Sequence, residues 1–389
     1  MQTQVGIIGA GPAGLLLAQL LHNHGVESVV LESRDRDYVL ARVRAGVQEQ
    51  GTVDTFIEAG VGEKLLEQRM IHNGIYFNFA GESHYVDVKD LTGGQVVTVY
   101  GQRNITRDMI EAREAAGLPL LFEATATQIE GLDDDRAKIQ YRHNGEKKTL
   151  ECDFVVGCDG FHGISRNTIP AALQKVVTHE FPYSWFGVMA EAPPACHEVI
   201  YAHHPDGFAL QSMRGPNLSR LYIQCENGFD VNSWTDEMFF DEFEKRIQHD
   251  VNRGPIVQKG VAPMRSFVSE PMRYKRLFLA GDAAHIVPPT GAKGMNLAVA
   301  DVKLLDKALT DFYRSGKTKL LDRYSDLCLR RVWKVSRFSW WVTTTFHVDP
   351  NQSQFDTEVQ VATLRYLTDS RIGGQSFAEN YVGLPYGWL

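Results

Sequence analysis

Cysteine is scarce in this 389-residue sequence, with only five residues, an odd number that includes no CxxC pair. Neither a disulfide framework nor a metal site is therefore favoured, and a reducing compartment is expected. No apolar run reaches the roughly 20 residues that span a bilayer. The first residues also lack the basic start and the cleavage site of a secretory signal. We therefore expect a cytoplasmic protein without a membrane partner.

An excess of positive charge is also lacking, because 40 Lys and Arg residues against 48 Asp and Glu residues give a formal net charge of −8. The resulting field repels nucleic acid, so no such partner is expected, and an anionic ligand requires locally clustered arginines. Repeats and low-complexity linkers are absent from the sequence. Its 43% hydrophobic content is close to the globular average, and its length fits two or three domains.

What is present begins with a glycine-rich turn. Residues 4–32 predict a strand, a turn, a helix and a second strand, which together form a βαβ unit. Gly9, Gly11 and Gly14 have GxGxxG spacing, which allows a pyrophosphate to approach the helix N-terminus. Glu32 ends the second strand, where a carboxylate can bond a ribose hydroxyl. The unit predicts dinucleotide binding and fits NAD and FAD equally.

Two later segments place an Asp beside a Gly at the end of an apolar strand. They are Asp159-Gly160, after residues 154–157, and Gly281-Asp282, after residues 276–280. Such a carboxylate suits ribityl or ribose hydroxyls, while the glycine lets the backbone approach the ligand. Each segment taken alone is more typical of a simple turn. From about Gly294 onward the chain is predicted to be mainly helical.

A predicted hairpin carries a cluster of polar side chains. Strand periodicity places Ser212 and Arg214 on one face, and likewise Arg220 and Tyr222. If the turn is centred on Asn217, Ser212 faces Tyr222 and Arg214 faces Arg220. Two opposed guanidinium groups repel unless an anion lies nearby. From spacing alone, an anion site and a solvated polar face are equally compatible with the pattern.

The glycine turn and the two Asp–Gly corners, in this order, resemble the flavoprotein aromatic hydroxylases, which bind FAD through these segments. The similarity extends over residues 38–46, 159–166, 281–294 and 379–386 and is most specific to members that act on 4-hydroxybenzoate. It implies an α/β fold with a discontinuous Rossmann-like FAD-binding domain, a mixed-sheet substrate domain and a helical C-terminal region. The implied boundaries are 1–72, 97–178 and 266–320 for FAD binding, 73–96 and 179–265 for substrate binding, and 321–389 for the helices.

The resemblance also implies an activity. The expected reaction is hydroxylation of 4-hydroxybenzoate at C3 to 3,4-dihydroxybenzoate, with FAD, O₂ and NADPH or NADH, through a flavin C4a-hydroperoxide. A homodimer is implied as well. Two alternatives remain. A nicotinamide-only dehydrogenase leaves the two Asp–Gly corners unexplained, whereas a flavin-binding redox sensor without turnover shares the FAD motifs.

The resemblance further implies roles for individual residues. The expected substrate-binding residues are Tyr201, Ser212, Arg214, Tyr222, Pro289 and Thr290. The expected catalytic residues are Pro289, whose carbonyl contacts the substrate hydroxyl, and a proton relay of Tyr201, Tyr381 and His72, in which His72 titrates near neutrality. The expected FAD-binding residues are Gly9, Gly11, Gly14, Glu32, Arg42, Arg44, Gln102, Asp159, Arg220, Asp282, Lys293, Gly294 and Asn296. The expected coenzyme-binding residues are Arg34, Tyr38, His162, Arg166 and Arg265.

Residues 33–38 bear on the choice of coenzyme, because in the family they influence it. Ser33 stands where an arginine is common, and Asp35 adds negative charge. Arg34 and Arg36 can still bind a 2′-phosphate, so NADPH is the first expectation and NADH stays open.

Two further expectations concern apolar residues. Val199 lies on the same strand face as Tyr201, where it can widen or narrow the pocket, so a dihydroxylated benzoate is conceivable as substrate. The aromatic run 338–346, with Trp340 and Trp341, is predicted to belong to the core rather than to a subunit interface.

Overall fold

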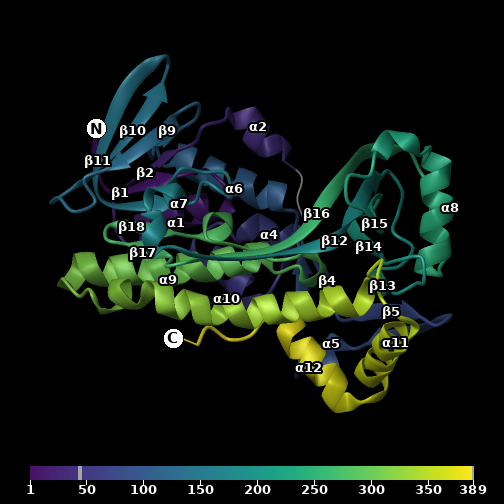
Figure 1. Ribbon diagram of the computed structural model, residues 1–389. Helices are drawn as coiled ribbons and strands as arrows, with labels where there is room; N and C mark the ends of the chain where they lie inside the picture. Colours follow the sequence, from purple (N-terminus) through teal and green to yellow (C-terminus); the bar gives the residue numbers. More distant parts are fainter. Residues whose placement is uncertain (43–45, 388–389) are drawn as a thin grey trace.

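The computed structural model describes residues 1–42 and 46–387, and within these ranges the strands form three sheets (Figure 1). The first sheet has the order β17-β18-β11-β1-β2-β8, and β10 and β9 continue it beside β11. Its strands are β1 (Gln2–Ile8), β2 (Ser28–Leu31), β8 (Leu120–Leu121), β9 (Thr125–Glu130), β10 (Ala137–His143), β11 (Glu146–Gly157), β17 (Arg273–Tyr274) and β18 (Leu277–Leu279). Because β18, β11, β1 and β2 are parallel, their carboxyl ends meet at one edge.

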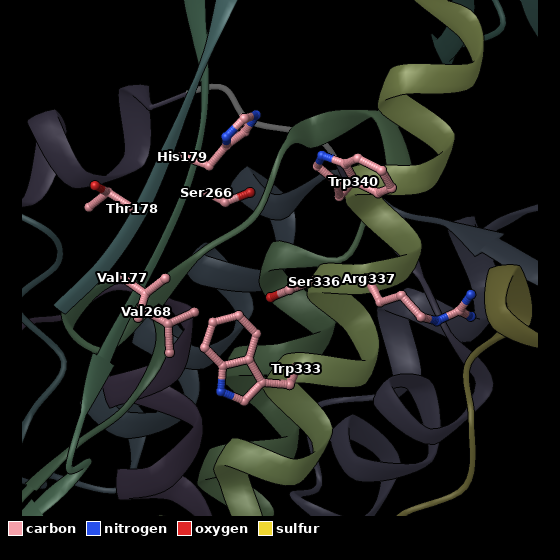
Figure 2. Close-up of a pocket in the computed structure, with 9 residues that line it drawn as sticks. All are labelled: Val177, Thr178, His179, Ser266, Val268, Trp333, Ser336, Arg337 and Trp340. Atoms are coloured by element: carbon pink, nitrogen blue, oxygen red, sulfur yellow. The ribbon is translucent and has the colours of Figure 1, made fainter. Parts of the chain in front are cut away.

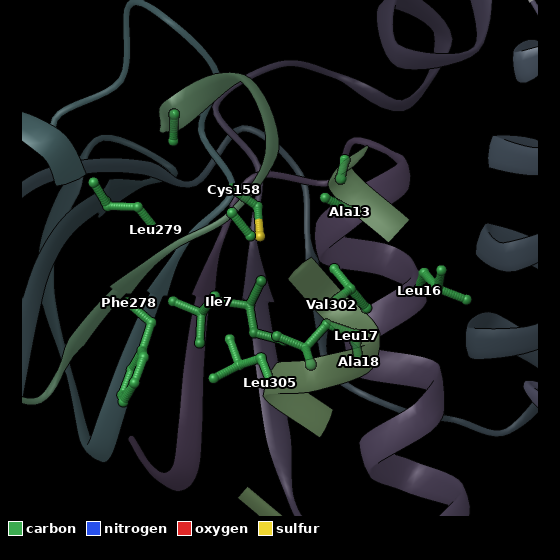
Figure 3. Packing of buried hydrophobic residues seen from close by; sticks show 14 of the residues in the cluster. Ile7, Ala13, Leu16, Leu17, Ala18, Cys158, Phe278, Leu279, Val302 and Leu305 are labelled. Atoms are coloured by element: carbon green, nitrogen blue, oxygen red, sulfur yellow. The ribbon is translucent and has the colours of Figure 1, made fainter. Parts of the chain in front are cut away.

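The core of this part lies between the first sheet and two helices, α1 (Pro12–Asn23) and α9 (Gly294–Ser315). Figure 3 shows Ile7 of β1 beside Leu17 of α1 and Leu305 of α9, all of them fully buried or nearly so. The βαβ unit and the change to helices at Gly294 are as the sequence predicts.

The second sheet has the order β19-β16-β12-β15-β14-β13-β5-β6. Its strands are β5 (Ile75–Phe79), β6 (Glu82–Val86), β12 (Lys175–Ala190), β13 (Val199–Ala202), β14 (Ala209–Gly215), β15 (Leu218–Glu226), β16 (Ile256–Glu270) and β19 (His285–Ile286). Alternation along these strands buries one face against α8 (Asp236–Ile247), through Ile200 and Leu221. The other face contains Tyr201 and Tyr222 and packs against the C-terminal helices.

Shorter elements join the two large sheets. A small sheet pairs β3 (Val47–Gln48) and β4 (Met70–His72) with β7 (Val97–Val99). The remaining α-helices are α2 (Arg36–Ala41), α3 (Gln50–Glu58), α4 (Glu63–Gln68), α5 (Val88–Leu91), α6 (Gln102–Ala115), α7 (Ser165–Thr168), α10 (Lys319–Phe346), α11 (Gln354–Asp369) and α12 (Arg371–Val382). Single 3₁₀ turns include η3 (Gly281–Ala283) and η4 (Pro289–Gly291). None of the helices within the described ranges is both long and apolar enough to cross a bilayer.

Helix α10 places its aromatic residues on two sides. Phe338 and Phe346 are buried, as predicted, but Trp340 is 48% exposed, so the prediction that it belongs to the core is wrong. Trp340 and Trp333 line a cavity of about 230 Å³ between α10 and strands β12 and β16 (Figure 2). The lining contains none of the predicted site residues. The two tryptophans are seven positions apart in the sequence, which is about two helical turns and puts both on one face of the helix, opposite the buried phenylalanines.

Candidate active site

The three predicted corners lie together at the carboxyl edge of the first sheet. A Cβ atom on Gly9 would lie 2.4 Å from the carbonyl oxygen of Cys158, which ends β11. A Cβ atom on Gly281, after β18, would lie 3.7 Å from Cβ of Ala13 at the start of α1. This edge of a parallel sheet, outside the strand ends, is where doubly wound folds bind their ligands.

The glycine turn fits a dinucleotide pyrophosphate. Gly9 has φ +106°, and a Cβ atom on Gly14 would lie 2.0 Å from the carbonyl oxygen of Gly9, so neither position accepts a larger residue. Gly11 differs, because within residues 1–42 and 46–387 no atom other than those of its chain neighbours lies within 4 Å of the Cβ that it lacks. Helix α1 begins after Gly11 without a side-chain cap. Open space in front of an uncapped helix N-terminus suits a phosphate group.

Carboxylates stabilise the corners themselves. Glu32 Oε2 accepts a hydrogen bond from the Ala10 N–H group at 2.8 Å. Asp159 Oδ2 accepts bonds from the backbone N–H and the hydroxyl of Ser165 at 2.9 and 2.8 Å. Burial raises the pKa of Asp159, although the Ser165 bonds oppose the shift. Asp159 therefore closes its own turn, and only Oδ1, which is buried and has no partner within the described ranges, is left for a cofactor hydroxyl.

A further carboxylate in this region, Asp301, was missed by sequence reasoning. Its Oδ2 accepts bonds from the Gly281 N–H group at 3.0 Å and from His285 Nε2 at 2.7 Å. Burial opposes protonation of His285, but the Asp301 carboxylate outweighs it and raises the pKa of His285. Asp301 lies in α9, 20 residues after Gly281 and 16 residues after His285, and it matches no motif. Only the fold therefore reveals its role.

The loop that precedes α9 is fixed by Asn296. Its Oδ1 accepts bonds from the Glu49 N–H group at 3.0 Å and from the Thr52 hydroxyl at 2.7 Å, and its Nδ2 donates to Ala292 O at 2.9 Å. The side chain, predicted to lie at the flavin, is therefore fully engaged with the protein. The carbonyl of Pro289 likewise accepts the Ala292 N–H group at 2.8 Å.

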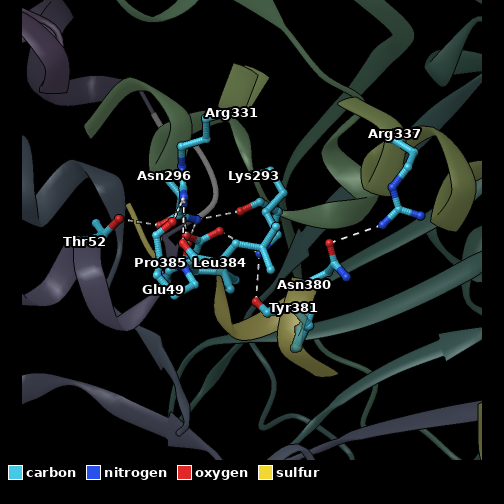
Figure 4. Close-up of polar contacts among 12 residues, drawn as sticks. Glu49, Thr52, Lys293, Asn296, Arg331, Arg337, Asn380, Tyr381, Leu384 and Pro385 are labelled. Carbon is cyan, nitrogen blue, oxygen red and sulfur yellow. Dashed lines mark hydrogen bonds and ion pairs between the residues drawn. The ribbon is translucent and has the colours of Figure 1, made fainter. Parts of the chain in front are cut away.

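Beside this loop lies a buried ion cluster that the sequence did not reveal (Figure 4). Lys293, which is 2% exposed, donates from Nζ to Glu49 Oε1 at 2.8 Å. The other oxygen of Glu49 accepts from Arg331 at 2.9 Å. Burial lowers the pKa of Lys293; Arg331 adds to this effect and Glu49 opposes it. Glu49 and Arg331 belong to no motif and come from distant parts of the sequence.

The hairpin between β14 and β15 brings the predicted polar cluster onto one face, but in a different register. Ser212 pairs with Arg220, and Leu210 rather than Ser212 pairs with Tyr222. The turn is centred between Pro216 and Asn217, because Gly215 pairs with Leu218, and a bulge between Met213 and Gly215 shifts the earlier pairs by one further residue. The predicted pairing of Ser212 with Tyr222, and of Arg214 with Arg220, is therefore wrong. Ser212 and Arg214 nevertheless lie together, because the Arg214 NH1 group donates to the Ser212 hydroxyl at 2.7 Å.

Arg214 is a partly buried cation in this cluster. Its NH1 group donates to the Ser212 hydroxyl at 2.7 Å and to the carbonyl of Met213 at 2.8 Å. Burial lowers the pKa of Arg214, as does Arg220, while Tyr222 opposes the shift. Within residues 1–42 and 46–387, no carboxylate forms an ion pair with Arg214. A cation that is partly shielded from water and has no acid partner favours an anionic ligand at this position.

The three residues predicted to form a proton relay come from β4, β13 and α12. The Tyr201 hydroxyl donates to the carbonyl of Thr290, and burial raises the pKa of both Tyr201 and Tyr381. His72 is 1% exposed, and neither of its ring nitrogens has a partner within the described part of the chain. Burial, then His197 and Arg214, lowers the pKa of His72 to about 4. The prediction that His72 titrates near neutrality is therefore wrong for the protein without ligand.

The residues predicted for the coenzyme form two groups. Arg265 and Arg166 lie over the ring of Phe161, at 4.0 and 4.8 Å from its centroid, and the ring of His162 lies 5.0 Å from it. In the second group, Arg34 lies 5.0 Å from the ring centroid of Tyr38.

The remaining predicted residues occupy element ends. Arg220 lies over the Tyr222 ring at 4.9 Å. Arg42 ends α2, Gln102 begins α6 and Gly294 begins α9. Asp282 lies in η3. Arg44 lies outside the described residues.

Comparison with known proteins follows this geometry. The sequence profile of a family described as an FAD binding domain matches residues 2–339. The p-hydroxybenzoate hydroxylase of Acinetobacter baylyi is 46% identical, and the alignment covers 99% of this chain and 96% of that protein. The chain belongs to the FAD-dependent aromatic hydroxylases. This chain is also 29% identical to a 3-(3-hydroxy-phenyl)propionate/3-hydroxycinnamic acid hydroxylase of Burkholderia vietnamiensis, and the alignment covers 77% of this chain and 55% of that protein.

Solved structures share the fold of this hydroxylase. The p-nitrophenol 4-monooxygenase of Pseudomonas putida superimposes with a TM-score of 0.84 over 99% of both chains, at 19% identity. An aklavinone-11 hydroxylase in complex with FAD and aklavinone gives a TM-score of 0.75 at 20% identity, over 91% of this chain and 70% of that one. These comparisons confirm the predicted fold class. They also leave the alternative of a nicotinamide-only dehydrogenase without support.

Proposed function

We propose that this FAD-dependent monooxygenase hydroxylates 4-hydroxybenzoate at C3 and forms 3,4-dihydroxybenzoate. The observation that supports the proposal is the partly buried Arg214 guanidinium, which has the Ser212 hydroxyl beside it and no carboxylate partner within residues 1–42 and 46–387. Arginine suits a benzoate carboxylate because its planar fork can donate two parallel hydrogen bonds. The similarity to the p-hydroxybenzoate hydroxylase of Acinetobacter baylyi supports the same substrate.

The proposed substrate site lies between Tyr201 and Tyr222 on one face of the second sheet. Tyr201, Leu210 and Tyr222 are cross-strand partners on three adjacent strands, so the two tyrosines stand about 10 Å apart. A carboxylate held at Arg214 places the para hydroxyl toward Tyr201. Gly187 makes this arrangement possible, because a Cβ atom there would lie 2.5 Å from the Tyr222 ring.

Tyr201 has the part of the first proton acceptor. Its hydroxyl donates to the carbonyl of Thr290, and its oxygen keeps lone pairs for a hydrogen bond from the substrate phenol. For a net transfer, Tyr201 would release its own hydroxyl proton toward Tyr381 as it takes up the phenolic proton of the substrate. Deprotonation makes the ring carbon beside the phenolic oxygen more nucleophilic, which lowers the barrier to hydroxylation. A carboxylate at Arg214 would also remove part of the repulsion that holds His72 neutral, and His72 would then take up the proton more readily.

FAD would be held by the corners at Gly9–Gly14, Asp159 and Asp282, with the loop before α9 alongside. When bound and reduced, it supplies the activation of O₂. The protein positions the aromatic acid, excludes water from the buried face and holds the cationic groups of the site in place. These contributions need no covalent bond between the substrate and the protein.

For the electron donor, we propose a reduced nicotinamide coenzyme that binds around Phe161. NADPH remains the first choice, but Arg36 donates two hydrogen bonds to Glu114, at 3.1 and 3.3 Å. A 2′-phosphate must therefore compete with Glu114 for Arg36. Within the described residues, the Arg34 guanidinium lies over the Tyr38 ring and forms no ion pair. Separate KM values for NADPH and NADH test this choice.

We also propose a cytoplasmic homodimer with the domain boundaries expected from the sequence. Trp333 and Trp340 are exposed on one face of α10, and large exposed aromatic groups are typical of protein interfaces. The two large sheets support these domain boundaries, because each sheet takes strands from separate segments and these segments alternate along the sequence. Sedimentation analysis of the wild type and of Trp340→Ala tests the interface.

The proposed function is tested by aerobic incubation with each reduced coenzyme and a panel of hydroxybenzoates. We expect 4-hydroxybenzoate to stimulate coenzyme oxidation with matching O₂ uptake and to yield 3,4-dihydroxybenzoate. Oxidation without a hydroxylated product would instead support a flavin-binding redox protein. Hydroxylation of 3,4-dihydroxybenzoate would show that Val199 leaves room for a second hydroxyl group.

A further inference from the structure

The buried cluster beside the loop before α9 carries an unbalanced charge. Lys293 and Arg331 are cations, and Glu49 is the only carboxylate that pairs with either of them within residues 1–42 and 46–387. Each cation takes a different oxygen of Glu49, at 2.8 and 2.9 Å. The cluster therefore has a net charge of one positive unit, in a region where all three side chains are buried or nearly so.

Arg331 has a second set of contacts. Its NH1 group donates to the carbonyl of Leu384 at 2.6 Å, and its guanidinium lies 4.9 Å from the ring centroid of Tyr386. We call the segment Gly383–Tyr386, held in this way by Arg331, the C-terminal clasp. Gly383 ends α12 with φ +101°, and a Cβ atom there would lie 2.1 Å from Glu49 Oε2.

The clasp connects the ion cluster to the substrate face. Tyr381 lies two residues before the clasp, and its backbone carbonyl accepts a hydrogen bond from Lys293 Nζ at 2.8 Å. The Tyr381 backbone is therefore linked through Lys293 to Glu49, and through Glu49 to Arg331. Sequence motifs do not reveal this link, because α10 provides Arg331 and the segment before α3 provides Glu49.

We propose that Arg331 is a positioning residue for the hydroxylation, an inference that rests on the proposed function. By holding one oxygen of Glu49, Arg331 prevents this carboxylate from neutralising Lys293 completely. The cluster then keeps the net positive charge that stabilises an anionic ring system nearby. By holding the clasp, Arg331 also fixes the end of α12, which carries Tyr381.

The proposal predicts how strongly the bound substrate is ionised. The titratable and charged groups that face the cluster are Lys293, Glu49, Arg331, Tyr381 and Tyr386. In Arg331→Gln holoenzyme the cluster becomes neutral, so the phenol of bound 4-hydroxybenzoate should titrate about one pKa unit higher, a tenfold loss of phenolate at a given pH. The phenolate absorption band measures this value without turnover.

Two variants separate charge from position. Arg331→Lys retains the positive charge but not the planar fork that reaches both Glu49 and the clasp, so its phenol pKa should stay near the wild-type value. Arg337→Gln is the matched control, because Arg337 also connects α10 to α12, through Asn380 at 3.4 Å, but does not touch Glu49. An unchanged phenol pKa in Arg331→Gln, or an equal shift in Arg337→Gln, would overturn the proposal.

Loss of Arg331 leaves Glu49 Oε2 without its partner, which can destabilise the fold. The same comparison is then made between Glu49→Gln and Glu49→Gln/Arg331→Gln, in which no carboxylate is left without a partner, and the same tenfold difference is expected.

If the wild type fails to bind 4-hydroxybenzoate, the proposed function is wrong, but the role of Arg331 is still testable. Without substrate, the midpoint potential of bound FAD should become more negative in Arg331→Gln and stay unchanged in Arg337→Gln; equal potentials would reject the role of Arg331.

Discussion

The cofactor edge and the substrate face satisfy their polar groups in opposite ways. At the edge of the first sheet, Glu32, Asp159 and Asp301 each bond to backbone or side-chain groups of the corners that they stabilise. In the region of the substrate face, Arg214 is a partly buried cation without an acid partner, and His72 leaves both ring nitrogens without a bond in the described structure. The cofactor edge therefore satisfies most of its carboxylate oxygens within the protein, with Asp159 Oδ1 as the exception, whereas the proposed substrate site leaves a cation and an imidazole available to a ligand.

The largest expected effect separates two glycines of the cofactor edge. Gly14→Ala should prevent folding or abolish FAD retention, because its Cβ atom would lie 2.0 Å from a backbone oxygen. Gly11→Ala should fold normally, since the described part of the chain places no atom beyond its own neighbours within 4 Å of the added atom, yet it should weaken FAD binding at least about tenfold by blocking the close approach of the pyrophosphate. Melting of the apoprotein and FAD titration measure the two properties.

A matched control for these variants is Gly260→Ala in β16, where the added Cβ atom also meets no neighbour. It should change neither melting nor FAD affinity. If Gly11→Ala bound FAD as tightly as Gly260→Ala does, the space before α1 would not be the pyrophosphate site.

On the substrate face, Tyr201→Phe should have the next largest effect. The variant should bind 4-hydroxybenzoate and oxidise the coenzyme, while formation of the hydroxylated product falls about a hundredfold, because the first proton acceptor is lost. Product yield per coenzyme oxidised measures this effect. Normal yield in the variant would remove Tyr201 from the proton path.

Arg214→Lys tests the anion site with a smaller expected effect. The dissociation constant of 4-hydroxybenzoate should rise about thirtyfold, equivalent to roughly 2 kcal/mol, because an ammonium group cannot reproduce the bidentate contact. The uncharged analogue 4-hydroxybenzamide is the control, and the substitution should change its binding much less. Equal losses for the two ligands would show that Arg214 supports the fold rather than the carboxylate.

The pH dependence of stability provides a test in the free energy of unfolding rather than in activity or binding. Because burial lowers the pKa of His72 from 6.5 to about 4, the unfolded chain binds a proton in this range that the folded chain does not. The free energy of unfolding therefore falls as pH decreases from about 6.5 to about 4. His72→Gln should reduce this loss by up to about 3 kcal/mol. Urea unfolding at several pH values measures the slope.

The same histidine can sharpen the contrast between the two regions. Saturating 4-hydroxybenzoate should raise the pKa of His72, as followed by NMR, because its carboxylate cancels the charge of Arg214. The amide analogue should leave the value near 4. A value that both ligands leave unchanged would disconnect His72 from the anion site.

The cofactor edge could be predicted closely because its constraints are local. The positive φ of Gly9 and the close approach at Gly14 are requirements that a short motif displays directly. The register of the hairpin could not be predicted, because the bulge between Met213 and Gly215 changes which residues pair without changing their alternation. The pKa of His72 also depends on neighbours from other strands.

The sequence by itself determined the family of the protein and predicted its three glycine and aspartate corners and the residues proposed to bind an aromatic acid, because these depend on residue type and short spacing. Only the tertiary structure decided the partners of the buried charges. Lys293, Glu49 and Arg331 lie far apart along the chain and meet only after the helices dock. The energy of a buried charge depends on the surrounding dielectric and on the nearest opposite charge, and both exist only once the chain has folded.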